Sequence, residues 1–174
     1  MSDFNEEFPV GQFDNSTTEK LLYLQHDKSH VFKNTSRVGF MSDVFEAYKN
    51  NRSRITLYRG LYVENISDFK SGDIYTFQRY QSFSEDLKIA EKFSKNQLII
   101  VLKSHDGGFN YWKWLVNYAE ILRQTDPQEF KYSDGEYIIT AAQEETEWIF
   151  DIGTRIRIIR IEEKSPYTHI IAEM

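Results

Sequence analysis

The sequence predicts an α+β fold in a single domain, and three observations support this. The chain has 174 residues, which is the size of one domain with a sizeable core. Hydrophobic residues make up 40% and charged residues 28%, a composition typical of globular proteins. Helical patterns come first and strand-like patterns dominate later, whereas a βαβ fold would alternate them. Because we find no linker, repeat or low-complexity tract, we expect residues 1–174 to form one domain.

Helices are expected in the N-terminal part, after an irregular polar arm over residues 1–15. In STTEKLLYLQHDKSH, Ser16 and Glu19 have the spacing of a capping box, and apolar residues follow at helical intervals. A second short helix is predicted in SDVFEAYKN, with Ser42 as its N-cap. Residues 1–50 are therefore expected to be an N-terminal helical part.

The middle of the chain predicts strands on both sides of a helix. RITLYRGLYV, residues 54–63, alternates in polarity and is rich in β-forming residues. GDIYTF is a second extended segment, entered through a turn at Ser71 and Gly72. SEDLKIAEKFSKN is expected to be a helix with Ser84 as its N-cap, and QLIIVLKS a buried strand.

The C-terminal third adds one long helix and then strands. DGGFNYWKWLVNYAEILRQTD predicts a turn followed by an aromatic-rich amphipathic helix. The next stretch, PQEFKYSDGEYIITAAQEE, is expected to be mostly loop with short extended pieces. TEWIFDIGTRIRIIRIEE predicts a hairpin of two strands around a turn at 151–154, and THIIAEM a short terminal strand.

Composition narrows the classes of function. The chain has no cysteine, which excludes disulfides and thiol chemistry. Its start, MSDFNEEFPV, lacks the basic and apolar regions of a signal peptide, and no apolar run approaches a membrane span, so we expect a cytoplasmic protein without membrane contact. A net charge of −6 disfavours a broad nucleic-acid footprint. Two local basic strips leave such a target open: Arg52, Arg54 and Arg59, and Arg155, Arg157 and Arg160.

Familiar cofactor and nucleophile motifs are absent. We find no P-loop, no GxGxxG and no GxSxG motif. Among the four histidines, His26 and His30 are four residues apart on the first expected helix, a spacing that suits a shared metal in principle. Only Asp27 lies near them as a further ligand, so surface histidines are the favoured interpretation, and no metal site is expected.

Polar residues interrupt two segments that otherwise resemble strands. Arg59 is followed at once by Gly60, and an arginine fork can bind phosphate where glycine lets a ligand approach the backbone. An arginine in a surface ion pair at a strand end is the alternative. Ser82 and Ser84 alternate, so both would lie on one face of an extended chain. The helix cap accounts for Ser84, whereas Ser82 is free to orient a neighbouring carboxylate.

The third segment, QEETEWIF, crowds carboxylates at the start of an apolar run. If the chain is extended here, Glu145 and Glu147 face one way and Thr146 the other. In an enclosed site such a pair shares protons. The following Trp148 indicates a segment that enters a core, although a solvated strand end is the alternative, and Glu144 is expected at the surface.

Taken in order, these segments resemble the Arg-Ser-Glu class of mono-ADP-ribosyltransferases. The triad would be Arg59, Ser82 and Glu147, within LYRG, SFS and ETE. The flanks agree over about residues 54–161: an aromatic residue before the serine motif (Tyr80), an A-x-x-F helix and an apolar strand after it, and a Gly-Thr turn after Glu-x-Glu. The small bacteriophage enzymes of the Mod and Alt type look most similar, because they too carry an aromatic helical insertion comparable to FNYWKWLVNYAEIL.

The resemblance implies an ADP-ribosyltransferase-like fold. Its core would be two packed, mostly antiparallel β-sheets, with N-terminal helices over residues 1–50, an inserted helix and a catalytic core over residues 54–161. Phe83 departs from the pattern, because the family more often has threonine there. As the middle residue of the motif, it is expected to point away from the site.

The resemblance also implies NAD as the co-substrate. Glu147 would hold the ribose 2′-hydroxyl and stabilise the positive charge that develops as the nicotinamide–ribose bond breaks. Ser82 would orient Glu147, and Arg59 would bind an NAD phosphate. Further NAD contacts are expected at Gly60, Tyr80 and Ser84.

The residue at position 145 concerns the acceptor. In the family, glutamate at this position accompanies arginine acceptors, whereas glutamine accompanies asparagine or cysteine-type acceptors. Glu145 would orient a guanidinium and take its proton, and a loop over residues 132–144, with Tyr137, would contact the target. An arginine of a bacterial host protein, modified by a phage enzyme in the host cytosol, is the expected target. A bacterial toxin, a nucleic-acid acceptor and an inactive binding domain are the alternatives.

Overall fold

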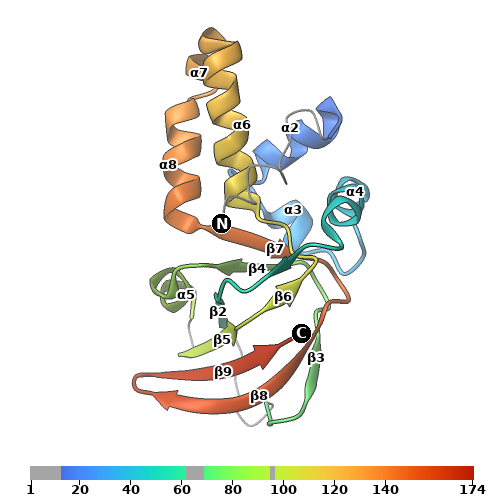
Figure 1. Ribbon diagram of the computed structural model, residues 1–174, viewed down its shortest axis with the longest axis vertical. Helices are drawn as coiled ribbons and strands as arrows, with labels where there is room; N and C mark the ends of the chain where they lie inside the picture. Colours follow the sequence, from blue (N-terminus) through green and yellow to red (C-terminus); the bar gives the residue numbers. More distant parts are fainter. Residues whose placement is uncertain (1–12, 62–68, 95–96) are drawn as a thin grey trace.

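The structure is a computed structural model that describes residues 13–61, 69–94 and 97–174. Most of its helices lie together at one end of a curled sheet, and α5 lies beside the strands (Figure 1). The helices are α2 (Asn15–Tyr23), α3 (Ser29–Phe32), α4 (Gly39–Tyr48), α5 (Leu87–Phe93), α6 (Tyr111–Thr125), α7 (Pro127–Tyr132) and α8 (Gly135–Glu145). The strands are β1 (Arg52–Ser53), β2 (Leu57–Leu61), β3 (Ile74–Thr76), β4 (Gln81–Ser84), β5 (Leu98–Leu102), β6 (His105–Asp106), β7 (Glu147–Phe150), β8 (Arg155–Lys164) and β9 (Tyr167–Glu173).

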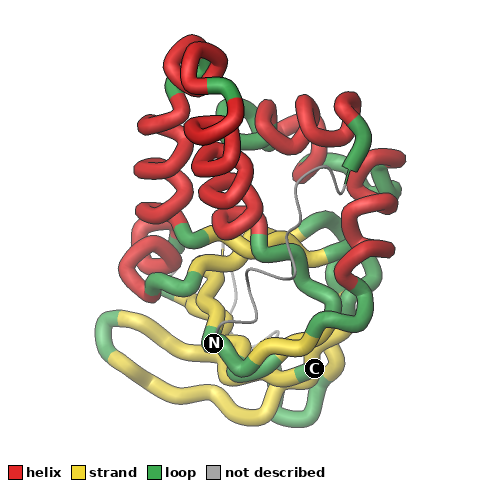
Figure 2. The backbone as a smooth tube through the Cα atoms, turned by 45° about the horizontal axis from the view of Figure 1, so that its top comes forward, coloured by secondary structure: helices red, strands yellow, loops and turns green. Residues whose placement is uncertain are grey.

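The strands form two sheets of unequal size. Seven strands pair in the order β3-β8-β9-β5-β2-β4-β7, and β1 pairs with β6 in a two-stranded antiparallel sheet. Within the larger sheet only the pairing of β5 with β9 is parallel. In Figure 2 the strands wrap round beneath the helices. The predicted α+β fold with mostly antiparallel sheets is confirmed, as one large curled sheet and one small sheet.

Two main apolar clusters hold these layers together. The first joins the helices to the end of the sheet and contains Leu21, Val44, Trp114 and Ile149, all at most 6% exposed. The second packs residues of β2, β4, β5, β7, β8 and β9 against one another. Phe83 belongs to the second cluster and is 1% exposed. Burial of an aromatic side chain of this size explains why the middle residue of SFS is apolar, as burying such a residue stabilises the fold by about 1.5–3 kcal/mol.

The first helices differ from the prediction in their boundaries. Asp14, not Ser16, is the N-cap of α2, and its carboxylate accepts a hydrogen bond of 2.7 Å from the Thr17 N–H. Aspartate at N-cap satisfies one of the free N–H groups of the first turn, and Ser16 then lies inside the helix. Because α2 ends at Tyr23, His26 and His30 do not share a helix.

Helix α4 begins at Gly39, three residues before the predicted cap. Its N-cap is Val38, which makes no side-chain capping bond. Ser42 lies within the helix, and its hydroxyl donates back to the Val38 carbonyl at 3.4 Å. Apolar residues at helical spacing, Phe40, Met41, Val44 and Phe45, are buried against the core, so packing rather than a cap fixes where this helix starts.

Ser84 is not the cap of α5. It is the last residue of β4, and the helix starts at Leu87 with Asp86 as N-cap, whose carboxylate accepts from the Lys88 N–H at 2.9 Å. The Ser84 hydroxyl accepts the Asp86 N–H at 3.0 Å and donates to the Glu145 carbonyl at 2.7 Å. The serine therefore ties β4 to the end of α8.

The stretch predicted as mostly loop, residues 127–145, forms the helices α7 and α8. Pro127 stands in the first turn of α7, and the Asp126 carboxylate caps it by accepting from the Glu129 N–H at 3.2 Å. In α8 the buried residues Ile138, Ile139 and Ala142 have helical spacing and lie against α6. The charged residues between them weakened the periodicity on which the prediction depended.

The predicted hairpin of β7 and β8 is wrong, although the turn at 151–154 is present. The Thr154 N–H donates to the Asp151 carbonyl at 3.3 Å, and Gly153 has a φ of 86°. The two strands on either side of this turn do not pair with each other: β7 pairs with β4, whereas β8 pairs with β3 and β9. The adjacency of two apolar runs in sequence does not fix which strands pair. No helix in the described part of the chain is long and apolar enough to cross a membrane.

Candidate active site

Strands β2, β4 and β7 bring the residues of the predicted triad into one cavity. Antiparallel pairing aligns Tyr58 with Ser84 and Ser84 with Glu147, so the three strands present their polar side chains at one place. The cavity has a volume of about 340 Å³, within the roughly 300–1,000 Å³ usual for ligand sites. The predicted residues that line it are Arg59, Gly60, Ser82, Ser84, Glu145 and Glu147.

Glu147 is a buried carboxylate, and its partners fix its orientation. It is 4% exposed at the start of β7. The Ser82 hydroxyl donates a hydrogen bond to its Oε2 atom. This hydrogen bond joins a serine in β4 to a carboxylate in β7. A buried carboxylate that stays charged needs such partners, because burial alone favours its neutral form.

Arg59 lies on the neighbouring strand with part of its donor set free for a ligand. Its Nη1 atom donates to the Ser82 carbonyl at 2.8 Å, and this contact aims the guanidinium. Its Nε atom is buried and has no hydrogen-bond partner within residues 13–61, 69–94 and 97–174. Burial lowers the pKa of Arg59, and the nearby Glu147 carboxylate acts in the opposite direction. An anion in the cavity would satisfy the buried donor, which otherwise costs stability.

Glu145 and Glu147 converge on the cavity by a route different from the predicted extended segment. Glu145 is the last residue of α8 and Glu147 the first of β7. Thr146 between them is left-handed, with φ 43° and ψ 49°, and its N–H closes the helix on the Ala142 carbonyl. Left-handed backbone is uncommon for threonine, so the surrounding contacts must hold it in place. The Ser84 hydroxyl supplies one, by binding the Glu145 carbonyl at 2.7 Å.

Lys28 also reaches this site, and we did not expect it from the sequence. Its Nζ atom lies 2.7 Å from Glu147 Oε1 and 3.2 Å from Glu145 Oε2. Burial lowers the pKa of Lys28, but the two carboxylates outweigh this and raise it, so the ammonium is charged at neutral pH. A single lysine between α2 and α3, without a motif around it, offers no pattern that a sequence analysis could use.

Gly60 is required by a close approach between β2 and α5. A Cβ atom at this position would lie 2.2 Å from the Ala90 carbonyl oxygen and 2.7 Å from the Ser94 backbone nitrogen. Backbone atoms cannot move aside as a flexible side chain can, so glycine lets the helix rest on the strand. This contact sets the distance between α5 and Arg59, two walls of the cavity.

We expect Gly60→Ala to destabilise the protein by about 2–3 kcal/mol, since added atoms in a packed region force the backbone apart. The melting temperature should fall by several degrees in a thermal unfolding experiment. Gly39→Ala is the matched control, because no atom lies within 4 Å of a Cβ built there. Equal melting temperatures for the two variants would show that α5 does not rest on the strand at Gly60.

Tyr80 does not line the cavity, so its predicted contact with NAD is not supported. Its ring is 1% exposed and stacks on Phe45 at a centroid distance of 5.9 Å. Its hydroxyl accepts the Val38 N–H at 2.7 Å. The aromatic residue before the serine motif therefore connects α4 to the chain at the start of β4.

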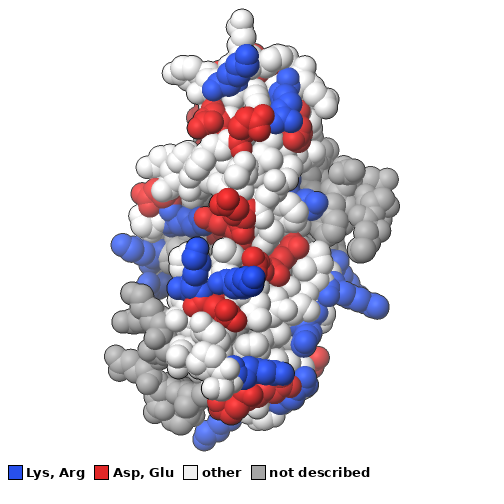
Figure 3. Space-filling model, turned by 90° about the vertical axis from the view of Figure 1, so that its left-hand side faces the viewer, with Lys and Arg blue, Asp and Glu red and all other residues white. Residues whose placement is uncertain are grey.

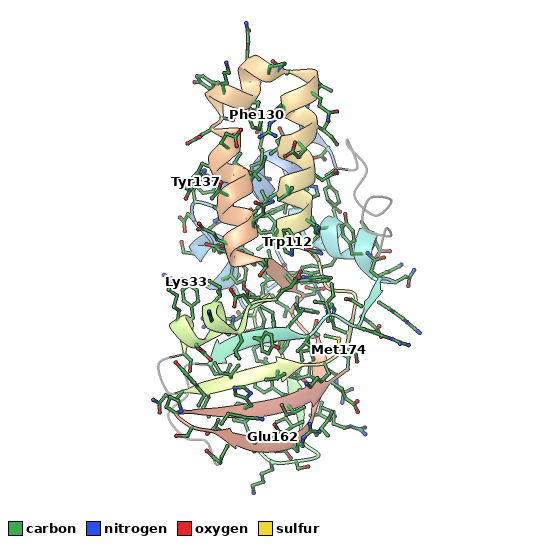
Figure 4. All side chains as sticks on the ribbon, turned by 60° about the vertical axis from the view of Figure 1, so that its left-hand side comes forward. Lys33, Trp112, Phe130, Tyr137, Glu162 and Met174 are labelled. Atoms are coloured by element: carbon green, nitrogen blue, oxygen red, sulfur yellow. The ribbon has the colours of Figure 1, made fainter. Side chains whose placement is uncertain are left out.

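Tyr137 lies on α8 and not on a loop. Its side chain is 51% exposed, and its ring lies parallel to that of His26 at 6.5 Å. Figure 4 shows it on the outer side of the paired helices α6 and α8. A contact with a target would therefore be made by a rigid helix face.

Glu85 joins the long helix α6 to strand β7. The indole N–H groups of Trp112 in α6 and Trp148 in β7 both donate to its Oε2 atom, at 2.6 and 2.9 Å. Figure 4 shows Trp112 at the base of α6, where the helices meet the sheet. Because Trp148 follows Glu147, this contact also fixes the start of β7.

Replacing Glu85 with alanine should leave two indole N–H groups without their acceptor. We expect a loss of about 2–3 kcal/mol of unfolding free energy, measured by urea denaturation, since hydrogen bonds to charged groups contribute about 1.5–3 kcal/mol each. Glu85→Gln keeps one acceptor oxygen and should lose less. An alanine variant as stable as the wild type would show that other contacts position α6.

The possible metal ligands and the two basic strips concern alternative functions, namely metal binding and nucleic-acid binding. No group of three or more histidine, aspartate or glutamate side chains within them could hold a metal ion. Arg59 lines the cavity and so leaves the basic strip proposed with Arg52 and Arg54. Arg160 in the second strip pairs with Glu162 at 2.5 Å. On the face shown in Figure 3, basic and acidic side chains are intermixed.

Comparison with known proteins gives a consistent picture of the fold. No family profile matches the sequence, and no curated protein is similar to it. Solved structures of ADP-ribosyltransferases do match. Exoenzyme S from Pseudomonas aeruginosa, in a complex with human 14-3-3 protein beta and bound to carba-NAD, has a TM-score of 0.64 at 12% identity, over 99% of this chain and 80% of its own.

Two toxins extend this likeness. The Vis toxin from Vibrio splendidus, an ADP-ribosyltransferase, has a TM-score of 0.63 at 16% identity, over 99% of this chain and 81% of its own. The C3 exoenzyme from Clostridium limosum has a TM-score of 0.57 at 13% identity, over 99% and 90% of the two chains. The chain therefore has the ADP-ribosyltransferase fold, as the resemblance implied.

Proposed function

We propose that the protein is a mono-ADP-ribosyltransferase that cleaves NAD and transfers ADP-ribose to arginine side chains of target proteins. One observation carries the proposal: Arg59, Ser82 and Glu147 line one cavity of an ADP-ribosyltransferase fold, with Glu145 also on its wall. Arg59, Ser82 and Glu147 come from three strands that are far apart in the sequence. Glu145 is separated from Glu147 by the end of α8. Their meeting in a single cavity argues against four independent surface residues.

The cavity suits a dinucleotide with an anionic middle. The buried Arg59 Nε atom, without a partner in the described residues, offers a donor to a phosphate oxygen. Gly60 stands next to it, where the missing side chain leaves room for α5, so the glycine keeps the helix wall of the cavity close to Arg59. The Ser84 hydroxyl is already engaged with the Glu145 carbonyl and the Asp86 N–H, which assigns it to holding the site together.

The chemistry follows from the position of Glu147. When the glycosidic bond of NAD breaks, its electron pair goes to the nicotinamide nitrogen and the ribose C1′ becomes an oxocarbenium-like cation. A carboxylate held in place by Ser82 stabilises that cation through the 2′-hydroxyl, and it does so without reorganising. A guanidine nitrogen of the acceptor then bonds to C1′.

Glu145 favours arginine as the acceptor. A guanidinium is protonated at neutral pH and is a poor nucleophile, because its ordinary pKa lies above about 12. The Glu145 side chain is 49% exposed, so a target residue from outside can reach it. Its carboxylate would orient the guanidinium and accept the proton that is released when the C–N bond forms.

The proposal is tested by incubating the protein with labelled NAD and cell lysates and mapping the modified residues by mass spectrometry. Label that resists nuclease, is removed by protease and maps to arginine is the expected result. Bacterial lysate is the first choice because of the resemblance to phage enzymes, and a eukaryotic lysate beside it tests a toxin. Label that nuclease removes would identify a nucleic-acid acceptor. No labelling and no thermal stabilisation by NAD would indicate an inactive binding domain.

A further inference from the structure

Lys28 stands where the proposed reaction needs the acceptor to be. Its Nζ atom contacts both carboxylates of the Glu-x-Glu motif, at 2.7 Å from Glu147 and 3.2 Å from Glu145. The carboxylate assigned to the acceptor is therefore already paired with a cation of the protein itself. Lys28 comes from the N-terminal helical part, which carries no motif, and it lines the cavity together with the catalytic residues.

The corner between α2 and α3 holds Lys28 in this place. Asp27, the preceding residue, accepts hydrogen bonds from the Ser29 N–H at 2.9 Å and the Ser29 hydroxyl at 2.6 Å, which closes a tight turn at Lys28. On the other side, the Gln25 side-chain amide donates to the Ile138 carbonyl of α8 at 3.1 Å. The corner is thus attached to the helix that carries Glu145.

The side chain of Lys28 is nevertheless able to leave. It is 33% exposed, so part of the side chain is in contact with solvent. A lysine side chain is long and flexible, and its ammonium is well hydrated when it is released. The backbone turn and the ion pair are therefore separate features, and the side chain can swing out while the turn remains.

We propose that Lys28 is a built-in substitute for the acceptor cation, which an incoming arginine must displace from Glu145. This inference rests on the proposed function, since it assigns Glu145 to the acceptor. With Lys28 in place, two carboxylates share one ammonium. A second cation that approaches the carboxylates is repelled by the positive charge of Lys28. A free guanidinium compound should therefore bind weakly. An arginine on a protein surface gains further contacts outside the cavity, so Lys28 selects protein acceptors over small ones.

The test is the binding of agmatine, a small guanidinium compound, by titration calorimetry without NAD. We expect Lys28→Ala to bind agmatine about tenfold more tightly than the wild type, as removal of a competing ion pair at a half-buried site allows. Lys28→Gln should give a similar gain, and it keeps a polar side chain in case alanine impairs folding. Uncharged N-butylurea should bind equally to all three proteins, because the competition is between cations.

Two controls isolate the ion pair. Lys33→Ala removes an exposed lysine of the same helical part, labelled in Figure 4, and should leave agmatine binding unchanged. In the background of Glu145→Gln, the replacement of Lys28 should bring little gain, because the carboxylate for which Lys28 and agmatine compete is gone. A gain of the same size in both backgrounds would overturn the assignment to Glu145.

The wild-type protein provides a second measurement. An amine-reactive reagent, followed by mass spectrometry, should label Lys28 more slowly than Lys33, and saturating agmatine should speed the labelling of Lys28 only. Agmatine affinity that is unchanged or weaker in both Lys28 variants would overturn the proposal, and so would no binding at all. Because these measurements need no turnover, labelled arginine in a target with unchanged agmatine affinity would refute this inference alone. Displacement of Lys28 by agmatine without any transfer to arginine would refute the proposed function, and what would remain is a cation site at Glu145 for which Lys28 competes.

Discussion

Replacement of Glu147 by glutamine is expected to lower ADP-ribose transfer by about a thousandfold, the upper range for loss of one preorganised electrostatic contact. Glutamine has the same shape, and its carbonyl oxygen can still accept the hydrogen bond from Ser82. It lacks the negative charge that stabilises the cation at the ribose C1′. Transfer from labelled NAD to protein, measured as an initial rate, gives the size of the loss.

The fold should survive this change. Glu147 is 4% exposed, so a neutral side chain removes the cost of burying its charge, while Lys28 keeps Glu145 as a partner. Its melting temperature should lie within a few degrees of the wild-type value. Glu144→Gln is the matched control. Glu144 is an exposed neighbour, and its variant should transfer ADP-ribose at the wild-type rate. A Glu147→Gln protein that still labels its target at nearly the normal rate would exclude Glu147 as the catalytic carboxylate.

Glu145→Gln should separate two activities that Glu147→Gln removes together. We expect transfer to arginine to fall about a hundredfold, since general-base catalysis contributes about 10²–10⁴-fold. Hydrolysis of NAD should fall much less. Water is the acceptor in that reaction, so there is no guanidinium for Glu145 to orient. Both rates can be followed in one reaction, as labelled protein and as free ADP-ribose.

The structure gives this expectation a physical basis. Glu145 is 49% exposed whereas Glu147 is buried, so an acceptor from solution meets Glu145 first. Loss of Glu145 leaves the hydrogen bond between Ser82 and Glu147 in place. Equal losses of transfer and hydrolysis would show that Glu145 supports NAD cleavage itself, and the division of roles would be wrong.

The residues of the cavity were predictable because they stand beside strongly patterned segments. Arg59 lies in β2 and Glu147 begins β7, and both strands contain buried apolar residues. The buried run Leu98–Leu102 forms β5, in the middle of the sheet. The long helix α6 followed from its amphipathic pattern in the same way. Such patterns reflect burial, which the sequence records directly.

Other features depend on contacts between distant residues, which a single sequence does not record. Ser84 has the right chemistry for a helix cap, yet Asp86 takes that role and leaves Ser84 for the Glu145 carbonyl. Helices α7 and α8 gain their stability by packing on α6. Lys28 was missed because only the tertiary fold brings residue 28 to residues 145 and 147.

The left-handed residue Thr146 is the junction between a helix and the sheet, and the two carboxylates stand on either side of it. Glu145 is the last residue of α8, whereas Glu147 is the first residue of β7, in the sheet that also holds Arg59 and Ser82. We expect substitutions between α6 and α8 to shift the Glu145 carboxylate more than the Glu147 carboxylate. If the proposed function holds, substitutions in α6 and α8 are the expected route to a changed acceptor, with Arg59, Ser82 and Glu147 kept.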